Sequence, residues 1–186
     1  MSALVVNLFS GPGSGKSTVA ANIFSELKWA GINCELATEY AKDKVWEESF
    51  EVLKNQIYVF GKQHHRLFVL KEKVDVIIVD SPLPLTMIYD QEKRIVLEKL
   101  VMEEFLKFDN INFFIKRKKE YNPKGRLHSE NESKNKDKEI EDMLLRLKEE
   151  YEIKYSFIDG TRDGVKEVCD IIFMRIGMNS INTNIN

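Results

Sequence analysis

The sequence is poor in cysteine and lacks a long apolar run. Two of its 186 residues are cysteines, Cys34 and Cys169, and they lie far apart and match no metal-ligand spacing. This excludes a disulfide-rich scaffold and a cysteine-ligated metal site, and it predicts a reducing compartment. No apolar run approaches the length of a membrane-spanning helix, and the N-terminus leads directly into a strand pattern without a signal peptide. We therefore expect a cytoplasmic protein with no membrane partner.

An excess of charge of one sign is also missing. Lys and Arg number 28 against 30 Asp and Glu, for a formal net charge of −2. No global field attracts nucleic acid, so any contact with nucleic acid must be local. The hydrophobic and charged fractions, 43% and 31%, are typical of a globular protein, and we predict one domain over 1–178. The Asn-rich remainder, 179–186, is predicted to be a flexible tail.

What the sequence does contain is a glycine-rich loop, Ser10-Gly11-Pro12-Gly13-Ser14-Gly15-Lys16-Ser17-Thr18, directly after an apolar run over 4–9. A buried strand, a glycine-rich turn and Lys-Ser opening a helix are the arrangement of a nucleotide phosphate loop. Glycines let backbone N–H groups approach phosphate oxygens, and the helix N-terminus adds its positive dipole end. We expect Lys16 to contact the β- and γ-phosphates of ATP and Ser17 to ligate Mg²⁺. Ser10 departs from the strict pattern, which has glycine there. The residues predicted to bind the nucleotide are Gly11, Pro12, Gly13, Ser14, Gly15, Lys16, Ser17 and Thr18.

Five apolar runs alternate with helical patterns along the chain. The runs are uninterrupted, as in strands that are buried on both faces of a parallel sheet. We therefore predict an α/β, three-layer P-loop NTPase fold, in which helices flank a five-stranded parallel sheet. The predicted strands are 3–9, 34–38, 74–80, 112–115 and 154–158, and the predicted helices are 16–30, 46–71, 95–108, a stripe over 140–151, and 163–176.

Two acidic residues end predicted strands at the edge of the sheet that carries the phosphate loop. Asp80 ends the third run and Glu39 follows the second. Acids in such places hold Mg²⁺ or accept the proton of the attacking hydroxyl, and we predict both as catalytic residues, with Asp80 also as a metal ligand. The structural alternatives are a helix N-cap for Asp80 and a cap or a salt bridge with Lys42 for Glu39.

A long polar segment, 116–136, follows the fourth predicted strand. Within 116–126 there are six basic residues against one acid. A polar insertion at the ligand-binding edge of the sheet predicts a basic lid that closes over phosphates and excludes water, and the alternative is a solvated loop.

Contacts with the acceptor substrate are predicted for Tyr40, Asp43, Arg66 and Lys118. Tyr40 offers a stacking surface, and Asp43 alternatively starts a helix over 44–48. Arg66 with Lys62 offers cations for an acceptor phosphate, and Lys118 offers one for the phosphates of a nucleic acid. His64 and His65 are adjacent, so at most one of them faces the site from a helix.

The chain resembles the small P-loop kinases of bacteriophages. The resemblance is carried by the 10–18 loop, by Thr38-Glu39-Tyr40-Ala41-Lys42-Asp43, by Val79-Asp80-Ser81-Pro82, and by Tyr121-Asn122-Pro123-Lys124-Gly125-Arg126 with Asp137. Within this group it is similar to the 5-hydroxymethyluracil DNA kinases, and more remotely to nicotinamide riboside kinase and deoxynucleoside kinase domains. The resemblance implies that Lys16 and Ser17 bind ATP and Mg²⁺, that Asp80 and Glu39 have acid–base or metal roles, and that Arg126 is a lid arginine on the transferring phosphoryl group. It also implies a phage protein acting in the cytoplasm of an infected bacterium.

Together these observations predict an ATP-dependent kinase that phosphorylates a hydroxyl of a nucleoside-type acceptor. The leading form of this prediction is phosphorylation of the 5-hydroxymethyl group of 5-hydroxymethyluracil in DNA. The alternatives are a nucleoside, deoxynucleoside or nucleoside monophosphate kinase and, in another class, a nucleotide-dependent binding switch or ATPase. The sequence does not predict the oligomeric state.

Overall fold

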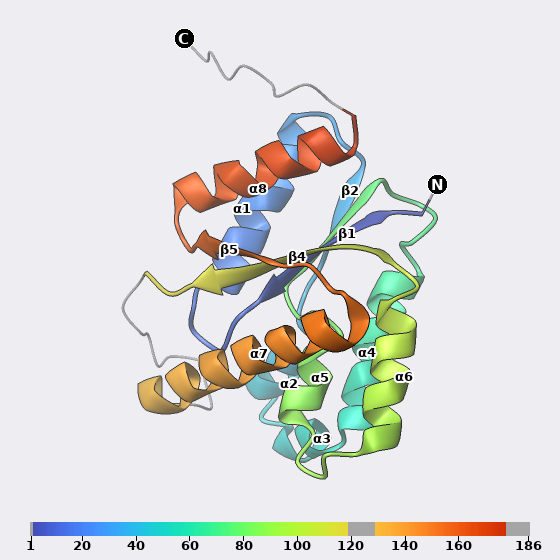
Figure 1. Cartoon of the computed structure of the whole chain (residues 1–186), viewed down its shortest axis with the longest axis vertical. Helices are drawn as coiled ribbons and strands as arrows, with labels where there is room; N and C mark the ends of the chain where they lie inside the picture. Colours follow the sequence, from blue (N-terminus) through green and yellow to red (C-terminus); the bar gives the residue numbers. More distant parts are fainter. Residues whose placement is uncertain (1, 119–128, 178–186) are drawn as a thin grey trace.

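One parallel sheet organises the chain (Figure 1). The computed structural model describes residues 2–118 and 129–177. The strands are ordered β2-β3-β1-β4-β5 and every pairing is parallel. The predicted α/β P-loop fold with five parallel strands is confirmed. The strands are β1 (Leu4–Phe9), β2 (Cys34–Ala37), β3 (Val76–Val79), β4 (Asp109–Lys116) and β5 (Ser156–Asp159).

Helices cover both faces of the sheet, which makes three layers (Figure 1). Helices α1 and α8 pack on one face, and the remaining described helices lie on the other. In residues 2–118 and 129–177, no helix combines the length and the apolar character needed to cross a membrane. The helices are α1 (Lys16–Trp29), α2 (Tyr40–Trp46), α3 (Phe50–Lys54), α4 (Gln56–Phe68), α5 (Leu85–Tyr89), α6 (Ile95–Phe105), α7 (Glu130–Tyr151) and α8 (Arg162–Arg175).

The central strand shows why the apolar runs do not alternate with polar residues. Val5 and Phe9 of β1 pack in the core under α4, α6 and α7, whereas Val6 and Leu8 pack in the core under α1 and α8. All four side chains are fully buried. Burial of one such side chain contributes about 1.5–3 kcal/mol to the free energy of folding. A strand with two apolar faces is therefore most stable at the centre of the sheet, where helices cover both faces.

The predicted helix over 46–71 is wrong in its continuity. The chain forms three helices here, α2, α3 and α4, with breaks between them. Glu48 has a positive φ of 54°, and Asn55 caps α4 by accepting a hydrogen bond from the backbone N–H of Tyr58 at 3.2 Å. A left-handed residue and an asparagine cap interrupt the helical hydrogen bonds although the side-chain pattern is helical throughout.

The predicted polar insertion over 116–136 is too long at its C-terminal end. Helix α7 begins at Glu130 behind a capping box, in which Ser129 and Glu132 each bond the other's backbone N–H. Its first two turns are held at the surface by ion pairs such as Lys134 with Glu130 at 2.8 Å. A solvated helix of this kind needs no apolar face, so its composition looked like that of a loop. The predicted lid arginine Arg126 and the predicted tail lie outside the described residues.

Candidate active site

The phosphate loop joins β1 to α1 in the conformation that its glycines permit. Gly13 and Gly15 have positive φ angles of 78° and 102°. Helix α1 begins at Lys16, and its N-cap residue makes no side-chain capping bond. The N–H groups of its first turn are therefore directed at an anion site, in line with the predicted role of the loop.

Ser10 and Lys16 fix the two ends of this loop. The Lys16 ammonium donates to the backbone carbonyl of Ser10 at 2.7 Å and to that of Gly11 at 3.4 Å. The Ser10 side chain is fully buried and its hydroxyl is hydrogen-bonded to the hydroxyl of Ser14. The departure from glycine at position 10 is thus accommodated, because a serine hydroxyl finds a partner inside the loop.

Asp80 and Ser17 meet beside the loop. The Ser17 hydroxyl donates to Oδ2 of Asp80 at 2.7 Å, and Asp80 is only 4% exposed. Its Oδ1 is buried without a hydrogen-bond partner among the described residues. A buried carboxylate oxygen without a hydrogen-bond partner, next to a hydroxyl, offers two oxygen ligands that suit Mg²⁺. Mg²⁺ is commonly held by one or two carboxylates together with substrate phosphates. Asp80 does not cap α5, which begins later at Leu85 behind Pro84.

Glu39 stands at the carboxyl end of β2 and at the N-cap of α2. It makes no side-chain capping bond there, and it lines the same cavity as the phosphate loop. Tyr89 lines the cavity from α5. Burial, followed by the nearby Glu39 carboxylate, raises the pKa of Tyr89 well above its usual range, so its phenol stays protonated. Lys42, the alternative ion-pair partner predicted for Glu39, instead donates to the Ser17 hydroxyl at 3.4 Å.

One cavity of about 580 Å³ joins the phosphate loop, Glu39, Lys42 and Tyr89. At one end it is lined by the phosphate loop from Pro12 to Thr18, and at the other by side chains of α2 to α5. The far wall is largely apolar with a few amides and hydroxyls, a composition suited to a planar organic ligand. Its apolar members are Ala41, Val45, Trp46, Phe50, Leu53, Val59, Pro82 and Leu85, and its polar members include Gln56, Gln63, Thr86, Tyr89 and Gln91.

All four predicted acceptor contacts, Tyr40, Asp43, Arg66 and Lys118, lie outside the cavity lining. Arg66 donates to the Thr38 carbonyl at 2.6 Å and to the Asp43 carboxylate at 2.8 Å. Its guanidinium also lies 5.7 Å from the centre of the Tyr40 ring. These contacts join α4 to the start of α2. Tyr40, Asp43 and Arg66 therefore hold α2 against α4 and do not line the cavity in this structure.

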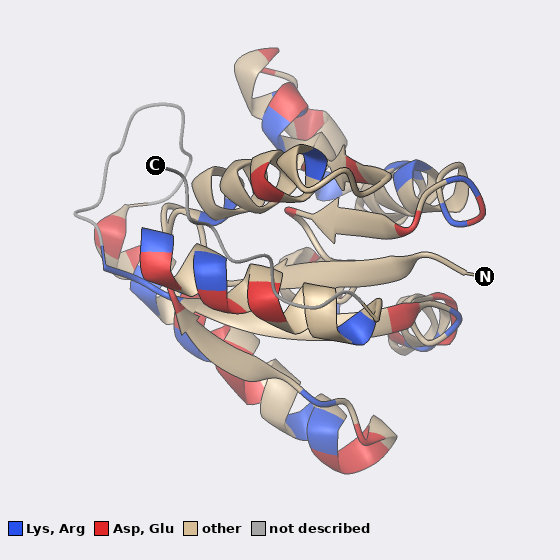
Figure 2. Ribbon diagram, turned by 90° about the horizontal axis from the view of Figure 1, so that it is seen from above, with Lys and Arg blue, Asp and Glu red and all other residues tan. Residues whose placement is uncertain are grey.

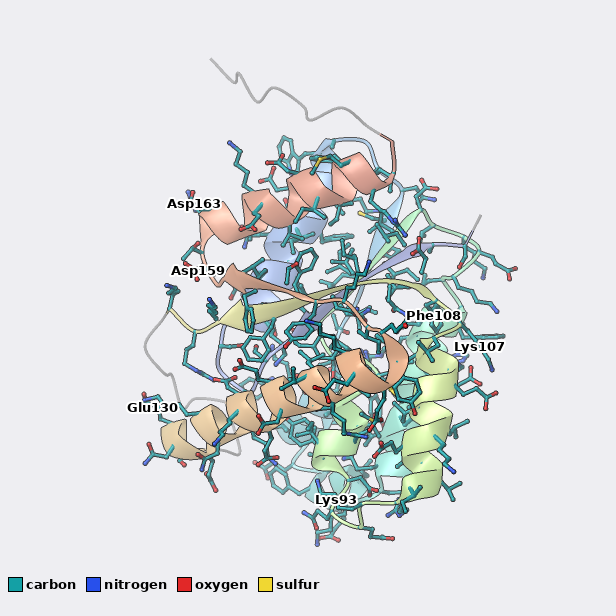
Figure 3. The ribbon with its side chains drawn as sticks, in the orientation of Figure 1. Lys93, Lys107, Phe108, Glu130, Asp159 and Asp163 are labelled. Carbon is teal, nitrogen blue, oxygen red and sulfur yellow. The ribbon has the colours of Figure 1, made fainter. Side chains whose placement is uncertain are left out.

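The basic residues that begin the predicted lid are engaged within the protein. Arg117 donates to Oδ2 of Asp137 at 2.8 Å and to the carbonyl of Pro12 at 3.0 Å. The other oxygen of Asp137 accepts the Gly11 N–H at 2.6 Å. Lys118, the fourth predicted acceptor contact, pairs with Asp159 at 3.1 Å. Figure 3 labels Asp159 at the end of β5, close to Asp163 in the first turn of α8.

The histidines of α4 do not line the cavity. His64 lies 3.2 Å from the Glu104 carboxylate and packs between the rings of Phe60 and Phe68. Neither His64 nor His65 is among the residues that line the cavity.

Several lining residues were not predicted from the sequence. Trp46 and Phe50 belong to the apolar wall of the cavity. Lys42 also lines the cavity and reaches the Ser17 hydroxyl. In a continuous helix, positions 46 and 50 are read as one face packed on the core. In the structure the helix is broken between them, and both line the cavity that the phosphate loop also lines. The only sequence signal was their closeness to Glu39.

A family model described as an AAA domain (AAA_28) matches residues 5–161. The chain belongs to this AAA domain family. The match spans the phosphate loop, Glu39, Asp80 and the whole parallel sheet up to β5. No curated protein matches the chain.

Two solved structures with TM-scores above 0.5 share the fold of this AAA domain at low identity. A deoxyadenosine kinase from M. mycoides, with the products dCMP and dCDP bound, has a TM-score of 0.53 and 19% identity, and the match covers 93% of this chain and 98% of that one. The same enzyme with dCTP bound gives a TM-score of 0.51 at 19% identity and the same coverage. The APS kinase CysC of Mycobacterium tuberculosis gives a TM-score of 0.45 at 18% identity and covers 92% of this chain and 97% of that one.

Proposed function

We propose that the chain is an ATP-dependent phosphotransferase that phosphorylates a hydroxyl of a nucleoside held in the cavity. One observation carries this proposal: a single cavity joins the phosphate loop, the Glu39 carboxylate and a largely apolar wall that includes Trp46 and Phe50. The cavity can thereby hold a phosphoryl donor at the phosphate loop and a flat organic acceptor at the apolar wall, with Glu39 between them. The named nucleotide-bound kinases with the same fold support a nucleoside in preference to DNA as acceptor.

The residues divide the chemistry among them. The loop N–H groups and Lys16 hold the β- and γ-phosphates, and Ser17 and Asp80 are the residues that would hold Mg²⁺. When bound, Mg²⁺ supplies positive charge that neutralises the phosphate oxygens. Glu39 accepts the proton of the acceptor hydroxyl. The acceptor oxygen forms a bond to the γ-phosphorus while the bond from that phosphorus to the leaving ADP oxygen breaks.

The two cations predicted to anchor an acceptor phosphate do not lie in the cavity. The cations predicted for such a phosphate were Lys62 and Arg66, and neither lines the cavity. Lys62 lies 5.3 Å from the centre of the Tyr58 ring, and Arg66 is bonded to Thr38 and Asp43. Lys54 does line the cavity, but it pairs with Glu51 at 2.6 Å.

DNA as acceptor, the leading prediction from the sequence, finds little support in the described basic residues. Lys116 lies 4.9 Å from the centre of the Phe157 ring, and Arg117 and Lys118 are paired with Asp137 and Asp159. Figure 2 shows acidic and basic residues interspersed over the helices rather than gathered on one face. A protein that binds DNA phosphates needs cations that are free to contact them. The 5-hydroxymethyluracil DNA kinase assignment therefore stays a prediction.

The decisive experiment is transfer of label from γ-labelled ATP to a panel of acceptors at two salt concentrations. The panel holds free nucleosides, nucleoside monophosphates, DNA with and without 5-hydroxymethyluracil, and water. We expect labelled nucleoside monophosphate, with a rate that changes little with salt because a nucleoside carries no phosphates. Labelling confined to hydroxymethyluracil DNA, falling steeply as salt rises, would establish the DNA kinase instead. Release of phosphate alone would establish an ATPase.

A matched pair of variants tests the acceptor wall. Trp46 lines the cavity, whereas Trp29 of α1 is 87% exposed and is not among the lining residues. We expect Trp46→Ala to raise the KM for the nucleoside about tenfold and leave the KM for ATP unchanged, because stacking on a base is worth about 1–3 kcal/mol. Trp29→Ala should change neither value. Equal behaviour of the two variants would place the acceptor elsewhere.

A further inference from the structure

Lys42 is a cation in the cavity that the proposed function does not yet use. It lies on α2, one helical turn after Glu39, and lines the cavity. Its ammonium donates to the Ser17 hydroxyl at 3.4 Å, and that hydroxyl in turn donates to Asp80 at 2.7 Å. Lys42 therefore reaches the phosphate end of the cavity from the acceptor side.

The neighbouring lysines differ from Lys42 in their partners. Lys16 is held by the backbone carbonyls of its own loop. Lys44, on the same helix as Lys42, pairs with Glu47 and lies 5.4 Å from the centre of the Tyr40 ring. Within residues 2–118 and 129–177, Lys42 makes no ion pair with a carboxylate, and its one hydrogen bond goes to Ser17. Its charge is thus available to a ligand.

The role of Ser17 as a predicted Mg²⁺ ligand determines which atoms the Lys42 ammonium can contact. The Ser17 oxygen is the predicted Mg²⁺ ligand, and an ammonium does not share an oxygen closely with a divalent cation because the two charges repel. The strong acceptors next to that oxygen are the non-bridging oxygens of the γ-phosphoryl group. The flexible four-carbon stem of lysine lets the ammonium turn to them.

We infer that Lys42 is a second catalytic cation, which contacts the γ-phosphoryl group from the side opposite Lys16. This inference rests on the proposed function. It gives α2 two roles within one turn: Glu39 at its N-cap receives the acceptor proton, and Lys42 neutralises charge on the phosphoryl oxygens as the group transfers. Both groups therefore move together with a single short helix.

Nucleotide affinity, measured by calorimetry with Mg²⁺, separates this role from others. The ligands are ADP and AMPPNP, which differ by the γ-position, and the variants are Lys42→Met, Lys42→Arg and the matched control Lys44→Met. We expect Lys42→Met to weaken AMPPNP about tenfold and ADP by less than about twofold, because one charge-assisted hydrogen bond to the γ-phosphoryl is lost. Lys42→Arg should retain part of the AMPPNP affinity, and Lys44→Met should retain all of it.

Two results would overturn the inference. An equal loss for ADP and AMPPNP would show that Lys42 supports the loop rather than the γ-phosphoryl group. No loss for either nucleotide would show that it makes no contact. The transfer panel run on wild-type protein keeps the two proposals apart: a γ-specific loss without labelled acceptor would support Lys42 and overturn the kinase, and labelled nucleoside without a γ-specific loss would do the reverse.

Discussion

Two halves of the carboxyl edge of the sheet treat their charged residues differently. Beside β2 and β3, Glu39 and Lys42 line a cavity with the phosphate loop. Beside β4 and β5, Arg117 and Asp137 form an ion pair with each other and hydrogen bonds to the backbone of the phosphate loop. Charged residues stand in both halves, so the presence of charge does not mark the site. Arg117 and Asp137 therefore support the phosphate loop, whereas Lys42 reaches the Ser17 hydroxyl from the cavity.

The half beside β4 and β5, called the paired half, holds the backbone of the phosphate loop in place. Asp137 of α7 accepts the Gly11 N–H, while Arg117 at the end of β4 binds Asp137 and the Pro12 carbonyl. Two elements far apart in the chain thus fix the first turn of the phosphate loop. The two halves make different predictions, because variants in the cavity half should affect transfer and variants in the paired half should affect stability.

Lys16→Ala should have the largest effect. Loss of a point charge on the phosphates should reduce transfer by several orders of magnitude, roughly 10³-fold or more, while the fold persists. The measurement is the rate of label transfer, with thermal unfolding as the control for folding. Turnover close to wild type in the folded variant would contradict the kinase assignment.

Asp80→Asn and Glu39→Gln should come next. Each keeps the size of the side chain and removes its charge, so we expect transfer to fall roughly 10²–10⁴-fold with nucleotide binding retained. Nucleotide binding is measured by calorimetry alongside the transfer rate. Near-normal rates in both variants would mean that these acids are structural.

Asp137→Ala, compared with Asp159→Ala, tests the paired half. The Arg117–Asp137 side chains are 13% and 21% exposed, whereas those of Lys118–Asp159 are 49% and 46% exposed. We expect Asp137→Ala to lower the free energy of unfolding by about 1–3 kcal/mol, since it strands the Gly11 N–H and a shielded guanidinium. Asp159→Ala should cost less than about 1 kcal/mol, because its pair is exposed. Urea unfolding measures both, and equal losses would contradict the distinction.

Cys169 should give no pH-dependent effect near neutral pH and should act only in alkaline solution. Burial raises the pKa of its thiol from 9.0 to about 12, so the folded state binds a proton that the unfolded state releases above pH 9. This stabilisation is full below pH 9 and is lost as pH rises from there toward 12. The free energy of unfolding of Cys169→Ala should therefore fall less steeply than that of wild type above pH 9, and identical slopes would contradict the shift.

Much of this site was predictable because its signals are local. The 10–18 loop shows its glycines, its lysine and its position after an apolar strand within a few residues. Asp80 and Glu39 were predicted because parallel strands end at a common edge, and the structure brings Glu39 into the cavity and Asp80 onto Ser17. The predicted roles of Tyr40, Asp43 and Arg66 depended on where a side chain points, and in the structure they brace α2 against α4.

The sequence by itself determined the phosphate loop, the parallel sheet and the two acids, since each follows from a short pattern with one stable backbone solution. Tertiary structure decided which partner each cation meets. Lys42 and Lys44 lie two residues apart on one helix, yet one reaches Ser17 and the other pairs with Glu47. Arg117 finds Asp137 only because β4 and the start of α7 come together at the loop. A charge takes its role from its nearest partner in space, and a sequence pattern does not contain that distance.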